Sequence, residues 1–139
     1  MARDKYHEHV RNALIKDGWT ITHDPYRLPY LSSKDQEIDL GAEKMVFGAQ
    51  KGNEQIAVEV KSFTADSFLQ DLYKSVGQYL IYLSGLEIED PSRKLFLAVP
   101  QNTFEEEFDT KPMRDLLRKY DIKIVVVNID NQTVAQWLT

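Results

Sequence analysis

The chain has 139 residues, of which 42% are hydrophobic and 28% are charged, and its formal net charge is −5. This composition is typical of a soluble globular protein with a proper core, and we predict a single domain over residues 1–139. The absence of cysteine excludes disulfides and thiolate metal sites. The negative charge argues against tight nonspecific binding of nucleic acid, which requires many phosphate contacts from lysine and arginine.

A membrane-spanning helix is not expected, because the sequence contains no run of about eighteen apolar residues. The N-terminal residues are mostly polar and charged and include no apolar signal region. We therefore expect a cytoplasmic protein that has no membrane partner.

A helix is predicted over residues 4–17, because apolar residues recur there at helical spacing and Gly18 suits the position just after a helix C-terminus. His7 and His9 are two positions apart, so they do not face one another on a helix and cannot share a metal ion. We expect both histidines to be exposed polar residues.

The next stretch is predicted to be mainly extended. Residues 19–23 alternate in polarity and form the first expected strand, and residues 25–36 follow as a loop. Residues 37–49 are expected to be extended, with a turn at residues 50–53. Residues 54–61 then return as the central strand of the predicted sheet.

The clearest helix is predicted over residues 66–84, where apolar side chains repeat at helical spacing. Its tyrosines, Tyr73, Tyr79 and Tyr82, are interpreted as packing residues rather than as a platform for stacking bases. Gln78 is a polar residue within this apolar neighbourhood, and a helix that follows the central strand could direct its amide towards that strand.

The C-terminal part continues the alternation of helices and strands. An acidic loop is expected at residues 86–92, before a buried strand at residues 94–99. After an irregular acidic segment, a short helix opens at residues 110–112, with proline in its first turn. Strands at residues 122–127 and 133–138 complete a mixed sheet flanked by helices.

The central strand carries charged residues on one of its faces. Because successive side chains of a strand alternate, Ile56, Val58 and Val60 point one way. Glu59 and Lys61 point the other way. Charged side chains are rarely buried without partners, so this face requires either a structural or a chemical explanation.

The chemical explanation is a divalent metal site. Asp39 lies upstream in a second alternating stretch, and Asp39 and Glu59 together would supply the oxygen ligands that Mg²⁺ or Mn²⁺ prefers. The backbone carbonyl of Val60 would supply a third oxygen. The metal would polarise a phosphodiester, and Lys61 would orient a bound water or stabilise the transition state. The pattern predicts metal-assisted phosphodiester hydrolysis.

Two questions stay open at this point. Glu59 and Lys61 are also common as a solvated, weakly interacting pair on a strand. In a straight hairpin Asp39 falls beyond Lys61, so a bulge or bend near Gly41 is needed to bring Asp39 back beside Glu59. Glu43, which is nearer in register, is the alternative first carboxylate.

The arrangement resembles the PD-(D/E)xK, or restriction-endonuclease-like, fold, which is an α/β (α+β) fold with a mixed sheet flanked by helices. In that fold an aspartate early in the hairpin precedes Asp/Glu-x-Lys on the next strand, and Asp39, Glu59 and Lys61 match these positions. Gln78 resembles the helical glutamine of many members, and Glu8 resembles the first-helix acid of some.

The resemblance extends to one family and runs along essentially the whole chain. Four segments, in order, are similar to the XisH family: Ile38–Glu43, Ala57–Phe63, Gly77–Tyr82 and Leu97–Pro100. XisH proteins are cyanobacterial factors that control excision of the fdxN element together with a site-specific recombinase and a companion, XisI. The resemblance implies a role in DNA rearrangement, with DNA, an XisI-like companion and a recombinase as partners.

Two classes of function follow from these observations. The first is a metal-dependent DNA endonuclease that uses Asp39, Glu59, Lys61 and Gln78, and the two active sites needed to cut both strands are compatible with a homodimer. The second is a non-catalytic accessory factor that binds DNA or a protein on the same fold, which the acidic net charge favours. A purely structural ion pair between Glu59 and Lys61 is a third interpretation.

Overall fold

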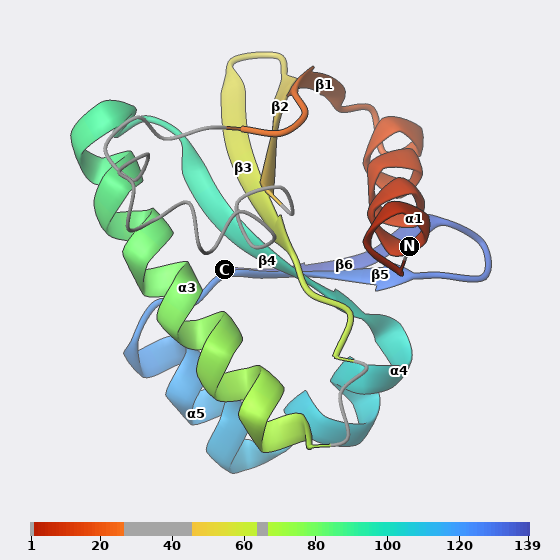
Figure 1. Ribbon diagram of the computed structural model, residues 1–139, viewed down its shortest axis with the longest axis vertical. Helices are drawn as coiled ribbons and strands as arrows, with labels where there is room; N and C mark the ends of the chain where they lie inside the picture. The colour runs from red at the N-terminus through yellow and green to blue at the C-terminus, as the bar shows by residue number, and fades with distance from the viewer. Residues whose placement is uncertain (1, 27–45, 64–66) are drawn as a thin grey trace.

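The computed structural model describes residues 2–26, 46–63 and 67–139 (Figure 1). These residues form one six-stranded sheet in the order β1-β2-β3-β4-β5-β6, with helices on both of its faces. The predicted fold class is therefore confirmed: this is a restriction-endonuclease-like α/β core with a mixed sheet flanked by helices. None of the described helices is long and apolar enough to cross a membrane.

In chain order, the elements are α1 (Ala2–Lys16), β1 (Thr20–His23), β2 (Val46–Lys51), β3 (Glu54–Val60), α3 (Phe68–Glu89), β4 (Lys94–Pro100), α4 (Gln101–Thr103), the π-helical turn η3 (Phe104–Phe108), α5 (Lys111–Lys119), β5 (Ile124–Asn128) and β6 (Thr133–Leu138).

The sheet combines antiparallel and parallel pairing. Strands β1, β2 and β3 pair in antiparallel fashion, whereas β3, β4 and β5 run parallel, and β6 is antiparallel to β5. Parallel neighbours need crossover connections, which α3 supplies between β3 and β4, and α4, η3 and α5 supply between β4 and β5. The carboxyl ends of β3, β4 and β5 therefore lie at the same edge of the sheet.

Two buried clusters lie on opposite faces of the sheet. One contains the inner residues of α3 and α5, and the other contains the inner residues of α1 (Figure 1). Ile56, Val58 and Val60 lie in the α1 cluster, whereas Ala57 lies in the α3 cluster. The predicted alternation of β3 is confirmed, and Glu59, which shares a face with Ala57, points to the α3 side.

Helix α1 ends as the sequence predicts. Gly18 has φ +96°, its N–H donates to the carbonyl of Ile15, and the N–H of Trp19 donates to the carbonyl of Leu14, both at 3.0 Å. This pair of bonds closes the last turn and satisfies carbonyls that the helix leaves free.

The predicted exposure of His7 is wrong. Its side chain is only 2% exposed, and its Nε2 lies 2.8 Å from a carboxylate oxygen of Asp24, at the end of β1. The ring also contacts Phe47 edge-on, with the ring centroids 5.0 Å apart. His7 therefore joins α1 to the sheet, a role that its polarity concealed because the partner comes from a later element.

Helix α3 extends further than predicted, to Glu89, and occupies most of the expected acidic loop. Leu86 is 1% exposed and continues the buried side of the helix beyond Gly85, which is itself buried. The segment after β4 also differs from the irregular stretch expected. It forms α4 and η3, because Phe104 and Phe108 are both buried.

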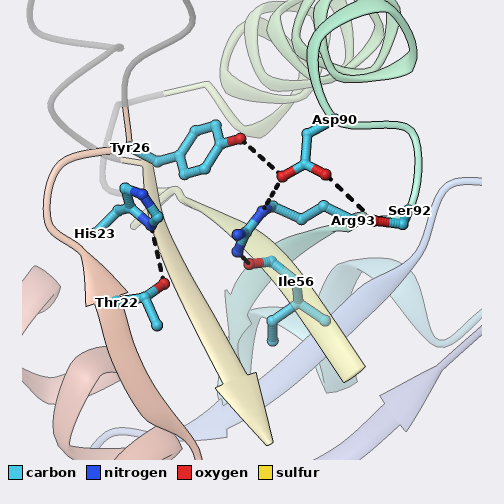
Figure 2. Close-up of polar contacts among 7 residues, drawn as sticks. All are labelled: Thr22, His23, Tyr26, Ile56, Asp90, Ser92 and Arg93. Atoms are coloured by element: carbon cyan, nitrogen blue, oxygen red, sulfur yellow. Dashed lines mark hydrogen bonds and ion pairs between the residues drawn. The ribbon is translucent and has the colours of Figure 1, made fainter. Parts of the chain in front are cut away.

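A polar network holds the C-terminal end of α3 to the sheet (Figure 2). Arg93, which is 7% exposed, donates from Nε to Asp90 at 2.9 Å and from Nη1 to the carbonyl of Ile56 at 2.8 Å. The Tyr26 hydroxyl donates to the same Asp90 carboxylate at 3.2 Å, and its ring lies 4.9 Å from the Arg93 guanidinium carbon. The bond from Arg93 holds the pKa of the Asp90 carboxyl below its usual value.

This network approaches the backbone of β2 closely. A Cβ at position 48 would lie 2.9 Å from Cδ2 of Tyr26, 3.0 Å from His23 and 3.1 Å from Arg93. The first of these distances is shorter than real Cβ contacts and the other two are tight, so a side chain at position 48 would force its neighbours to shift.

We predict that Gly48→Ala lowers the free energy of unfolding by about 1 to 3 kcal/mol, because the added methyl group overpacks the network. Urea unfolding measures the effect. The control is the same substitution in a Tyr26→Ala background, where the cost should be smaller because one crowding side chain is gone. An equal cost in both backgrounds would contradict the steric explanation.

Candidate functional site

The buried carboxylate of Glu59 is the central feature of the site. Glu59 is 2% exposed on β3, between Val46 of β2 and Leu97 of β4. Its Oε1 is buried and has no hydrogen-bond partner among the described residues. Burial raises the pKa of Glu59 well above its usual value, and the nearby charge of Lys61 opposes that rise.

Lys61, two residues further along the chain, is held by an ion pair with α3. Its Nζ lies 3.2 Å from Oδ1 of Asp71, and the two side chains are 22% and 8% exposed. The backbone N–H of Lys61 donates to the carbonyl of Ala98, which extends the pairing with β4 by one residue. The ammonium is therefore fixed between the end of β3 and the first turns of α3, on the same side of the sheet as Glu59.

Gln78 lies on α3 seven residues after Asp71, and this spacing places both on the same side of the helix. Its side chain is half-buried. The next residue, Tyr79, donates from its hydroxyl to the carbonyl of Leu95 at 2.9 Å and accepts from the N–H of Lys123 at 3.0 Å. Burial raises the pKa of Tyr79 to about 12, and the negative charge of Glu59 contributes to the rise.

Of the remaining predicted site residues, the structure describes only some. Asp39 and Glu43 lie outside the described residues, so which of them is the first carboxylate stays a prediction. Val60 is buried and its side chain faces α1. Glu8 is about half exposed and lies 4.0 Å from Arg11, so its described contact is with a neighbour on its own helix.

A hard divalent cation fits what is described of this site. Glu59 offers a buried oxygen that lacks a partner, and carboxylate oxygens are the ligands that Mg²⁺ prefers. Within residues 2–26, 46–63 and 67–139, no group of three or more His, Cys, Asp or Glu side chains could hold a metal ion. Asp39, the second carboxylate of the predicted site, lies outside the described residues.

A cavity of about 720 Å³ opens where β3, β4 and β5 end. Its lining includes Ser62 and Phe63, which follow Lys61, as well as Tyr6 and His9 of α1. The Tyr6 hydroxyl and His9 Nδ1 are buried without hydrogen-bond partners in the described structure. Glu105 and Asp130 also line the cavity, and the described residues of its lining include no lysine or arginine.

Asp71 is the site residue that the sequence analysis missed. It is 6% exposed although it is charged, and it lies one position before the buried Leu72 on the inner side of α3. A carboxylate on the buried side of a predicted helix was the available signal. Its partner could not be identified, because Lys61 is close to it only once α3 is folded back onto the sheet.

The fold and this site define an α/β protein whose mixed sheet carries a buried carboxylate beside a fixed lysine. The family model described as XisH protein matches residues 1–135, and the chain belongs to the XisH family. No curated protein matches the chain.

Two solved structures are similar over nearly the whole chain. The crystal structure of an XisH family protein from Nostoc punctiforme has a TM-score of 0.84 and 29% identity, and the match covers 97% of this chain and 99% of that one. The crystal structure of a fdxN element excision controlling factor protein from Anabaena variabilis has a TM-score of 0.83 and 30% identity, with coverage of 98% and 99%.

We predict that Glu59→Gln raises the melting temperature of the metal-free protein near pH 8. Because the pKa of Glu59 is raised in the folded state, its contribution to stability is fully present below the unfolded-state pKa and is lost as pH rises through the folded-state pKa. The variant lacks this loss, so its advantage should shrink towards about pH 4.

Thermal unfolding followed by circular dichroism over this pH range tests the prediction. Glu54→Gln is the matched control, because Glu54 lies on the same strand but is exposed, and it should leave the pH profile unchanged. A clear drop in the melting temperature of Glu59→Gln near neutral pH would count against an uncompensated buried carboxylate.

Proposed function

We propose that this chain is an excision controlling factor in site-specific DNA rearrangement and that its core is a metal-dependent DNA endonuclease. The observation that carries the proposal is the buried, unpartnered carboxylate oxygen of Glu59 beside the fixed ammonium of Lys61. A buried charge without a partner destabilises a fold, and such groups cluster at functional sites. The similar protein from Anabaena variabilis, an excision controlling factor, supports the biological role.

In the proposed mechanism, Asp39, Glu59 and the backbone carbonyl of Val60 would hold Mg²⁺ or Mn²⁺. A bound metal would polarise the phosphodiester of the substrate and lower the pKa of a bound water. Lys61 would stabilise the negative charge that develops on the phosphate, from the position in which Asp71 holds it. Gln78, on the same side of α3 as Asp71, would orient the phosphate or the attacking water.

The proposed partners are DNA, an XisI-like companion protein and a site-specific recombinase, all of which rest on the family. A chain with a net charge of −5 has little general attraction for DNA, because such attraction depends on lysine and arginine contacts to phosphates. A partner protein would therefore help to bring this site to its DNA substrate.

We predict that Mg²⁺ or Mn²⁺ raises the melting temperature of the wild type and leaves that of Glu59→Gln unchanged. A ligand that binds only the folded state stabilises it, and the variant lacks the anionic oxygen that binds the metal. The metal should thus reverse the order of stability of the two proteins. Titration calorimetry with each metal, on the wild type and on Glu59→Ala, measures the binding directly.

Incubation of the wild type with linear and branched DNA then decides between the functions. Metal binding that is lost in Glu59→Ala, together with metal-dependent nicking, supports the endonuclease. Binding without cleavage favours an accessory factor, and the absence of any metal binding would overturn the metal site.

The ion pair between Lys61 and Asp71 favours a second candidate, a non-catalytic accessory factor on the same fold. A lysine that is held by a buried carboxylate already has a structural role, because it joins β3 to α3. In this alternative the site residues maintain the shape of a surface that binds DNA or a partner protein.

We predict that Asp71→Asn lowers the free energy of unfolding by about 1 to 3 kcal/mol, because Lys61 loses a charged partner in a largely buried position. Asp115→Asn is the control, since its ion pair with Lys111 is exposed and the change should stay within about 0.5 kcal/mol. If the folded Asp71→Asn variant also loses nicking while it retains metal binding, Asp71 positions Lys61 for catalysis. Unchanged nicking would limit Asp71 to a structural role.

A further inference from the structure

The outward side of α3 carries an exposed apolar surface. Of the seven large hydrophobic side chains that are exposed among the described residues, five lie on α3. These five, which we call the α3 outer face, are Leu69, Tyr73, Leu80, Ile81 and Ile88, with exposed fractions from 44% to 65%. At about 100° per residue they fall within an arc of about 120°, on the side of the helix opposite the buried Tyr79 and Leu86.

The middle of the α3 outer face carries small residues. Gly77 and Ser84 are exposed and lie near the centre line of the arc, between the larger side chains. A Cβ at position 77 would meet no atom within 4 Å. Because the distance between packed helices depends on the side chains at their contact, another helix could approach α3 closely here.

The order of residues along the α3 outer face is nearly palindromic about the junction of Leu80 and Ile81. The small residues Gly77 and Ser84 lie equally far from this junction, and so do the large residues Tyr73 and Ile88. A two-fold axis through the junction would place the glycine of one copy against the serine of the other. Tyr73 of one copy would then meet Ile88 of the other, and the reverse, as a two-fold contact requires.

The polar residues beside the face fit the same arrangement. In an antiparallel pair of α3 helices, Tyr73 of one copy comes to the level of Glu87 of the other on the same flank, where its hydroxyl can donate to the carboxylate.

We propose that the α3 outer face is the interface of a homodimer in which the two α3 helices pack antiparallel. The face spans about 28 Å along the helix and is one helix wide, which is at the small end of specific interfaces. The dimer should therefore dissociate on dilution. This inference does not rest on the proposed function, and its tests measure association rather than metal binding or cleavage.

The absence of cysteine from the chain makes cross-linking a clean test. Leu80 lies next to the proposed two-fold axis, so a cysteine there would face its counterpart in the other copy. A short bismaleimide should convert Leu80→Cys to covalent dimers in high yield. Glu106→Cys is the control, because Glu106 is exposed on η3 and is not part of the α3 outer face, so it should give only the low yield of random collisions.

A second pair of variants tests the apolar contact. Ile81→Glu should shift sedimentation of the protein from dimer to monomer and raise the apparent dissociation constant about tenfold or more, since it introduces a charge next to the axis. Ile15→Glu is the matched control, because Ile15 is 47% exposed on α1, on the other side of the sheet. It should leave the dimer unchanged.

Gly77→Leu separates loss of association from loss of folding. The monomer has room for the side chain and α3 gains helix propensity, so the circular dichroism spectrum should remain that of the folded protein. The dimer should be lost, because the added bulk fills the closest approach of the two helices.

The proposal is overturned if the wild type sediments as a monomer up to its highest soluble concentration. The α3 outer face would then be a binding surface for a different protein. The proposal is also overturned if a dimer forms but Ile81→Glu and Ile15→Glu affect it equally, or if the two cysteine variants cross-link to the same extent.

Discussion

The buried guanidinium of Arg93 joins parts of the chain that no local interaction could bring together. It bonds the carboxylate of Asp90 at the end of α3 and the carbonyl of Ile56 in β3, and it stacks on Tyr26 beyond β1. At the other end of α3, the ion pair between Lys61 and Asp71 joins the helix to the end of β3. Helix α3 is thus fixed at both ends by buried or half-buried charges, and its inner side is held against β3 and β4.

Because α3 is held at both ends, it keeps Glu59 buried. The helix covers the face of β3 on which Glu59 lies, and it removes the carboxylate from water without offering its Oε1 a partner. A fold under no functional constraint would replace such a residue by an apolar or amide side chain of similar size, because desolvation of an unpaired charge is unfavourable. The burial of an unpartnered glutamate here is the physical reason to infer a ligand for it, and a divalent cation is the ligand that matches its oxygen.

The elements that could be predicted from the sequence are those in which apolar residues recur at regular spacing. The alternation in β3 and the apolar spacing in α3 were sufficient to predict the sheet, the helix that follows β3, and that Glu59 faces away from Ile56, Val58 and Val60. Sequence reasoning failed where one long-range contact decides the environment of a polar residue. The burial of His7 depends on Asp24, and the position of Lys61 depends on Asp71, and neither partner can be recognised before the chain is folded. Asp39 remains a prediction.

The apolar pattern of α3 also concealed a distinction that only the structure reveals. The sequence shows apolar residues around most of the helix, but the fold buries Tyr79 and Leu86 and leaves Tyr73 and Ile81 in water. The inner side therefore holds Asp71, which fixes Lys61, and the outer side carries the proposed dimer interface. Because the two sides are separate, a substitution such as Ile81→Glu should remove the dimer without disturbing the pair between Lys61 and Asp71. If the site is an endonuclease, the antiparallel dimer would hold two such sites in fixed relation, and loss of the dimer would convert cleavage of both strands into nicking of one.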